Sequence, residues 1–177
     1  GNDLTSLDVS NLNALTNLNC SYNYIQTLTT TGANNITQLN CKDNALSSLT
    51  VTNMLNLQIL DCESQGGGVG ISNLDLTGLS NLTHLSCRSN NLTSLDVSNL
   101  SNLNYLNCNY NQIPSLNLSN LTNLTFLSCG GNLLSSLNLT PLVNLTYLDC
   151  HSNQLSSLNI DSLVNLHDID CGQNSIS

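Results

Sequence analysis

The sequence predicts a solenoid of mainly β structure, in which one short unit repeats along the chain. Eight cysteines are separated by intervals of 21, 21, 25, 21, 21, 21 and 21 residues. Each lies in a version of the phrase L-x-x-L-x-C-x-x-N-x-L, as residues 145–155 illustrate. Apolar residues also recur 5, 8, 10, 13, 16 and 19 positions after a cysteine. A fixed period in this range is typical of solenoids. The cysteines are Cys20, Cys41, Cys62, Cys87, Cys108, Cys129, Cys150 and Cys171.

One turn of this repeat is too small to fold alone, because its few apolar side chains do not offset the entropy lost in ordering it. Stacked turns bury one another's apolar faces. We therefore expect residues 1–177 to form a single domain of about eight turns. The chain begins and ends in mid-repeat, so we also expect it to be a piece of a longer protein.

The residues that lead into each cysteine alternate between apolar and polar, which predicts a short strand. Strands from successive turns would lie ~4.8 Å apart in one parallel sheet. A second alternation, at residues 94–98, predicts an extended segment on the opposite side of each turn. No window is long enough to predict a helix there.

Asparagine recurs three positions after the cysteines, where its short amide can donate to and accept from the backbone of a tight turn. Stacked turns would join these amides into an internal ladder. The ladder members are Asn23, Asn44, Asn90, Asn111, Asn132, Asn153 and Asn174.

Two turns depart from the pattern. The turn after Cys62 is four residues longer, has no asparagine at the ladder position and carries a glycine run, so we expect a bulging, flexible loop near residues 65–70. A phosphate-binding loop is not predicted there, because no Lys-Ser/Thr pair follows the glycines. Thr30 and Ala33 give another turn less apolar volume than its neighbours have.

The cysteines are expected to be free thiols in the core. Neighbouring cysteines of a ladder are one strand spacing apart, whereas a disulfide needs Cβ atoms ~3.8 Å apart. The sequence has no C-x-x-C pair, so metal binding by the stacked cysteines is not predicted either.

The repeated phrase resembles the leucine-rich repeat, and its cysteine is similar to that in the cysteine-ladder repeats of internalin J and related bacterial surface proteins. The resemblance covers essentially the whole chain. It implies a right-handed, gently curved solenoid with its sheet on the concave face and extended or 3-10 segments on the convex side. It also implies an extracellular or cell-surface protein that serves adhesion or recognition. The capping domain and the wall anchor or sorting domain of such proteins are not in this sequence.

Composition excludes several classes of partner. The chain has 2 basic and 11 acidic residues and a net charge of −9. Nucleic acids and anionic membranes both require clusters of Lys and Arg, so neither is an expected partner. No apolar run is long enough to cross a membrane. No motif indicates a cofactor, and no pattern indicates an oligomeric state.

Three columns of side chains should lie on the solvent face of the sheet, at positions −3, −1 and +1 relative to each cysteine. The middle of the −3 column is apolar and aromatic, and such a row facing water is typical of a contact surface. We predict a non-enzymatic binding module for a protein or glycan ligand. The alternative is a structural spacer whose rings only stabilise the sheet. The predicted binding residues are Ile59, Asp61, His84, Arg88, Tyr105, Tyr110, Phe126, Tyr147 and His151.

Two further features lie near this surface. Gly130 and Gly131 should leave a shallow depression beside Phe126. His84 falls near Asp61 and Glu63, but an open sheet offers no desolvated pocket for catalysis, so we do not expect an enzyme.

Acidic residues gather near the end of the chain, beside His151, and unpaired carboxylates there would repel one another. Solvated carboxylates are the simpler interpretation of this cluster, and a bound cation such as calcium is the alternative. The candidate metal ligands are Asp149, Asp168 and Asp170.

Overall fold

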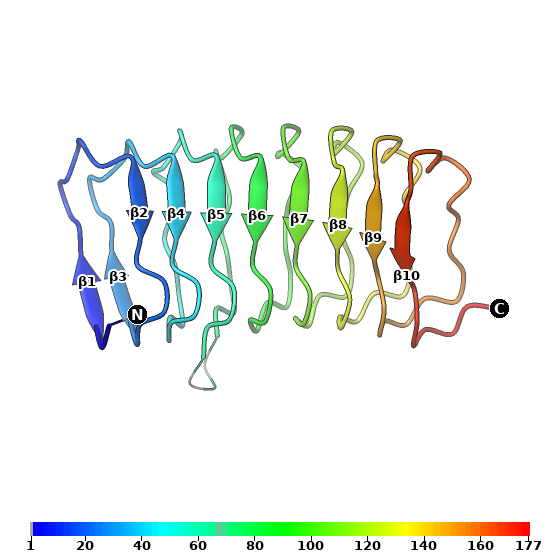
Figure 1. The fold of residues 1–177 in the computed structure, drawn as a ribbon, viewed down its shortest axis with the longest axis horizontal. Coiled ribbons are helices and arrows are strands. Elements are labelled where there is room, and N and C mark those ends of the chain that lie inside the picture. Colours follow the sequence, from blue (N-terminus) through cyan, green and yellow to red (C-terminus); the bar gives the residue numbers. More distant parts are fainter. Residues whose placement is uncertain (1, 67, 69) are drawn as a thin grey trace.

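The computed structural model describes residues 2–66, 68 and 70–177 as ten three-residue strands joined by turns, with no helix among them. The strands lie side by side along the long axis of the molecule (Figure 1). None of the described residues forms a membrane-spanning helix. The strands are β1 (Ser6–Asp8), β2 (Asn17–Asn19), β3 (Thr27–Thr29), β4 (Gln38–Asn40), β5 (Ile59–Asp61), β6 (His84–Ser86), β7 (Tyr105–Asn107), β8 (Phe126–Ser128), β9 (Tyr147–Asp149) and β10 (Asp168–Asp170).

The predicted parallel sheet is confirmed. Eight strands form it in the order β2, β4, β5, β6, β7, β8, β9 and β10. Equivalent residues of the repeat are paired, so Leu85 of β6 aligns with Leu106 of β7, and Leu106 with Leu127 of β8. The 21-residue period therefore places every −3 side chain beside the −3 side chain of the next turn.

Among the residues that the structure describes, the opposite side of the turns forms strands only near the start of the chain, where β1 and β3 make a two-stranded parallel sheet. Residues 94–98, predicted to be extended, form no strand. There the Asp96 carboxylate accepts hydrogen bonds from the backbone N–H and the hydroxyl of Ser98, at 3.0 and 2.6 Å. These local hydrogen bonds satisfy polar groups that would otherwise need a partner on a neighbouring strand.

The core is one continuous column of apolar side chains that runs through all the turns. Leu103, Leu106 and Cys108 have no exposed surface. The turn that contains Thr30 keeps a closed core nevertheless, because Ala33 and Ile36 are fully buried.

The predicted asparagine ladder is confirmed from Asn44 onward, whereas Asn23, in the first turn, donates only within its own turn. Asn111 Nδ2 donates to the carbonyls of Cys108, in its own turn, and Cys87, in the previous turn, at 3.0 and 3.1 Å. Its Oδ1 accepts the N–H of Leu92 at 3.0 Å. Each amide therefore satisfies backbone groups of two turns and joins them. The same contacts are made by Asn44, Asn90, Asn132, Asn153 and Asn174.

The turn after Cys62 lacks the ladder asparagine, as the sequence shows, but it does have a ladder amide. Gln65 takes the place of asparagine, since its Nε2 donates to the carbonyls of Cys41 and Cys62, both at 3.1 Å, and its Oε1 accepts the N–H of Leu46 at 3.0 Å. The longer side chain makes the same set of bonds. The loop predicted near residues 65–70 lies partly outside the described residues, since it includes 67 and 69.

A second ladder of asparagines lies on the surface and was not predicted. Asn123 Nδ2, for example, donates to the carbonyl of Ser101 in the previous turn at 2.9 Å. Its members recur with the same period as the cysteines, so the signal was present in the sequence. They are Asn35, Asn81, Asn102, Asn123, Asn144 and Asn165.

The thiols provide a direct test of the stacked core. All eight are free; seven of them are buried, and Cys171 is partly exposed. Burial raises the pKa of the Cys108 and Cys150 thiols to about 12, so few thiolates form at neutral pH. We expect a thiol reagent to label the native protein rapidly at Cys171 alone and the denatured protein at eight positions. Rapid labelling of several thiols in the native protein would contradict this core.

Candidate functional site

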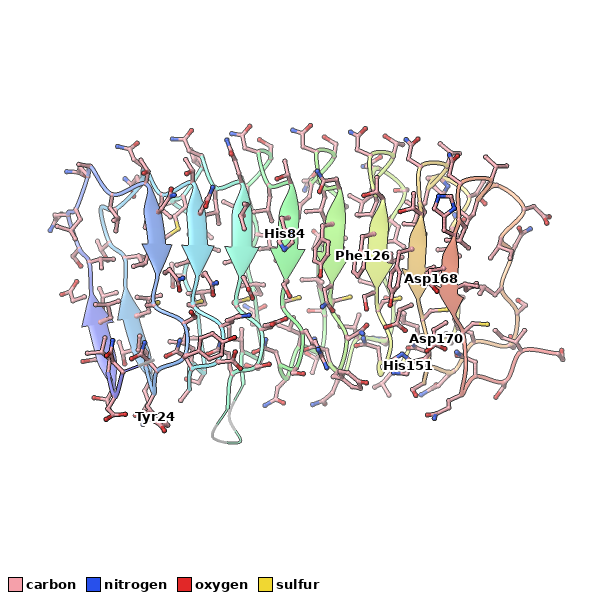
Figure 2. All side chains as sticks on the ribbon, viewed as in Figure 1. Tyr24, His84, Phe126, His151, Asp168 and Asp170 are labelled. Carbon is pink, nitrogen blue, oxygen red and sulfur yellow. The ribbon has the colours of Figure 1, made fainter. Side chains whose placement is uncertain are left out.

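Four rings form a continuous stack on the solvent face of the eight-stranded sheet. We call His84, Tyr105, Phe126 and Tyr147 the aromatic row; each is the first residue of its strand, β6 to β9. Successive ring centroids are 3.9, 4.3 and 4.4 Å apart, with interplanar angles of 7°, 8° and 3°. Figure 2 labels two of them, His84 and Phe126, over the sheet. The parallel register dictates this spacing, because it places consecutive −3 side chains one strand apart.

The rings cover one another's faces and turn their edges toward solvent. All four are half-buried, and Ile59, paired with His84 in the sheet, extends the row by one apolar side chain. Burial lowers the pKa of His84, although Glu63 acts in the opposite direction. Burial also raises the pKa of the Tyr105 and Tyr147 hydroxyls. The aromatic row is therefore uncharged at neutral pH.

The −1 column beside the row was expected to be exposed, and for three strands this is wrong. Ser86, Ser128 and Asp149 are buried, with 4, 3 and 6% of their surface exposed. Neighbouring side chains cover them, so the −1 column predicted to face solvent is closed at these three positions.

Asp149 is the centre of a hydrogen-bonded cluster that we call the carboxylate network, formed with Asn109, Ser128 and His151. Its Oδ2 accepts from Asn109 Nδ2 and Ser128 Oγ at 2.8 and 2.9 Å. Its Oδ1 pairs with Nδ1 of His151 at 2.5 Å. Burial raises the pKa of Asp149, but the hydrogen bonds from His151, Asn109 and Ser128 together outweigh that effect and hold it below its ordinary value. The carboxylate is therefore ionised and satisfied within the protein.

The depression predicted at Gly130 and Gly131 is filled by two rings, so that prediction is wrong. A Cβ atom on Gly130 would collide with the imidazole of His151, and one on Gly131 would lie 2.6 Å from the Tyr110 ring. The Tyr110 hydroxyl lies 3.3 Å from His151 Nε2. Because Gly130 and Gly131 have no side chains, the rings of His151 and Tyr110 can pack against the backbone there.

Both basic side chains of the protein lie over tyrosine rings. Lys42 Nζ is 5.3 Å from the centroid of Tyr22 and 3.7 Å from Glu63 Oε1. The Arg88 guanidinium is 5.2 Å from the centroid of Tyr110. Arg88, Tyr110 and His151 thus come together at one edge of the face, as three of the predicted binding residues.

The candidate cation ligands come together only in part. Single ligand atoms of Asp149, His151 and Asp170 lie within 4.8 Å of one another, and among the described residues Asp168 does not belong to this group. The repulsion expected between unpaired carboxylates is relieved at Asp149, because both of its oxygens accept hydrogen bonds from the protein. Calcium binding at this end stays an untested prediction.

A hollow of about 330 Å³ lies on the same face at the N-terminal end of the aromatic row. Asp61, Ile59 and His84, three predicted binding residues, line it together with polar side chains of β2 and β4. Within the described part of the chain, no hydrogen bond links His84 to a carboxylate, so the proximity of acid and imidazole noted in the sequence forms no catalytic pair.

Sequence reasoning missed the roles of Asn109 and Ser128. Asn109 is 40 residues from Asp149, nearly two turns away. Its side chain reaches the Asp149 carboxylate because the residue between them, Gly130, has no side chain. The backbone N–H of Gly130 donates to Asn109 Oδ1 at 2.5 Å and holds the amide in place. The one signal available was the pair of glycines.

Solved structures show which proteins this chain is similar to. The functional domain of InlJ from Listeria monocytogenes, described as including a cysteine ladder, matches with a TM-score of 0.95 and 40% identity over 98% of this chain and 38% of that one. The chain belongs to the leucine-rich-repeat family. Internalin C2 from Listeria monocytogenes matches this leucine-rich-repeat chain with 30% identity and a TM-score of 0.68, over 98% of this chain and 73% of that one. No family model and no curated protein sequence matches it.

Other leucine-rich-repeat proteins support the same assignment. YopM from Yersinia enterocolitica matches with a TM-score of 0.84 and 26% identity, over 99% of this chain and 36% of that one. The family fold is a scaffold for protein interactions and is generally non-enzymatic. Our chain spans well under half of InlJ and of YopM, so activities of those whole proteins do not pass directly to it.

Proposed function

We propose that this chain is a protein-recognition module of a bacterial surface or secreted protein, and that it contacts its partner through the aromatic row. The observation that carries the proposal is the uninterrupted stack of four rings on the solvent face of the sheet. The core is filled by aliphatic side chains and thiols without any ring. The aromatic residues were therefore not selected to fill the interior.

A protein partner fits the row better than a glycan does. A sugar packs its C–H groups against an open ring face, and the stacking in the row covers the inner faces. The exposed ring edges and Ile59 instead form a narrow apolar stripe with polar columns beside it. An apolar centre with a polar rim is the usual composition of a protein interface.

The thiol ladder is compatible with an extracellular location, which the similarity to internalins supports. Oxidising compartments usually convert exposed thiols to disulfides. Here the thiols are buried, and burial raises their pKa, so the reactive thiolate is suppressed.

The test is a binding screen against host-protein and glycan arrays with the wild type and a Tyr105→Ala/Phe126→Ala/Tyr147→Ala variant. We expect a protein ligand whose affinity falls at least about tenfold in the variant, because truncating buried aromatic anchors costs 1–2 kcal/mol or more each. Circular dichroism should show both proteins folded, since the cross-strand ring pairs contribute only ~0.2–1 kcal/mol each.

A matched control removes two rings outside the row, as Tyr22→Ala/Tyr24→Ala. These tyrosines are 55 and 62% exposed, near the N-terminal end. Equal binding by the wild type and the row variant, or ligands found only among glycans, would contradict the proposal. The first result would favour a structural spacer.

A further inference from the structure

The hollow next to the aromatic row contains a carboxylate with an incomplete set of hydrogen-bond donors. Asp61 lies at the −1 position of β5 and is half-buried. Its Oδ1 accepts the backbone N–H of Glu63 at 3.3 Å. Among the residues that the structure describes, its Oδ2 accepts no hydrogen bond. The side chain lines the hollow of about 330 Å³ together with Ile59 and His84.

Asp149 shows what a complete set looks like at the same position of the repeat. Both of its oxygens receive side-chain donors, from Asn109, Ser128 and His151, and its pKa is lowered. At Asp61 burial is the largest influence, and it raises the pKa. The backbone N–H of Glu63 and the charge of Lys42 lower the pKa, but the nearby carboxylates of Glu63 and Asp43 raise it further, so the net shift is upward. An external cation that supplies the missing hydrogen-bond donors would stabilise a half-buried carboxylate in this state.

Among the described residues neither basic side chain of the protein forms an ion pair or hydrogen bond with Asp61, although the charge of Lys42 is close enough to lower the pKa of that carboxyl. Lys42 pairs with Glu63 and lies over Tyr22, and Arg88 lies over Tyr110. With a net charge of −9, the surface also attracts a basic partner at long range. Charge complementarity therefore indicates a cationic group from outside.

The other walls of the hollow select among cations. Ile59 and the edge of the His84 ring are apolar and uncharged, whereas the amides of Gln38 and Asn40 are polar. A guanidinium is planar, weakly hydrated and able to bond a carboxylate while its flat surface lies on apolar groups. An ammonium is strongly hydrated and suits such walls less well.

We propose that this hollow accepts an arginine side chain of the protein partner, with its guanidinium bound to Asp61 beside the end of the aromatic row. This inference rests on the proposed function and adds to it the chemistry of the partner. The partner would carry an arginine next to the apolar residues that lie on the row.

The experiment is an NMR titration of the isotope-labelled protein with N-acetyl-arginine amide, compared with the uncharged citrulline and the lysine analogues. We expect the arginine probe to shift the side-chain amide signals of Gln38 and Asn40 saturably, and the citrulline probe to leave them unmoved. Asp61→Asn should weaken arginine binding about tenfold or more, as loss of a charge-assisted hydrogen bond does. That variant should fold, because asparagine occupies the equivalent position at Asn40 and Asn107.

The matched control is Asp96→Asn, on the opposite side of the turns, where asparagine also occupies equivalent positions at Asn117 and Asn138. Its arginine affinity should equal that of the wild type. Absence of saturable shifts, binding unchanged by Asp61→Asn, or equal binding of the lysine or citrulline probe would each overturn the inference. The probe reports on the hollow alone, so failure here together with row-dependent partner binding would leave the proposed function standing.

Discussion

Asn111→Ala is expected to lower the free energy of unfolding by about 2–3 kcal/mol. The amide of Asn111 donates to the carbonyls of Cys87 and Cys108 and accepts the N–H of Leu92. Alanine leaves these buried backbone groups without partners, and each unsatisfied group costs ~1–3 kcal/mol unless water reaches it. Urea denaturation followed by circular dichroism would measure the loss.

The matched control is Asn123→Ala in the surface ladder. That exposed amide donates one hydrogen bond, to the carbonyl of Ser101, which water can replace. We expect its removal to cost no more than about 1 kcal/mol. Equal denaturation midpoints for the Asn111 variant and the wild type would show that the internal ladder does not stabilise the solenoid.

Asp149→Ala is expected to cost about 2–3 kcal/mol at neutral pH, because hydrogen bonds to a charged group contribute more than neutral ones. The substitution leaves the buried Asn109 and Ser128 side chains without their acceptor. Removal of the exposed carboxylate of Asp168 is the control, and its effect should lie within about 0.5 kcal/mol of zero.

The same variant should change the dependence of stability on pH. Hydrogen bonds hold the pKa of Asp149 below its ordinary value in the folded protein, against the opposing effect of burial. Its contribution is therefore complete above the ordinary carboxyl pKa of ~4 and is lost as the pH falls through the lowered folded value. We expect the difference in stability between wild type and Asp149→Ala to shrink in acid. A constant difference from neutral pH into that range would contradict the carboxylate network.

Periodicity was enough to predict the contacts that recur from turn to turn along the repeat. The strand before each cysteine, the register that stacks Tyr105 on Phe126, and the ladder contact of Asn111 all follow from it. Each needs only the repeat length and the alternation of a strand.

Contacts that depend on side chains found in one or two turns alone could not be predicted in this way. Gln65 replaces a ladder asparagine because its extra methylene group still reaches the same carbonyls, which depends on backbone coordinates. His151 reaches Tyr110, 41 residues away, because Gly130 and Gly131 carry no Cβ in its path. The burial of Asp149 results from these same contacts.

Site-specific photocrosslinking tests most directly whether the aromatic row is the recognition surface. A photoreactive phenylalanine would replace Phe126 in one protein and Val143, which is 46% exposed and outside the row, in another. With the protein ligand selected in the array screen, we expect a crosslink from position 126 and none from position 143. A crosslink from position 143 alone would place the partner elsewhere and contradict our account.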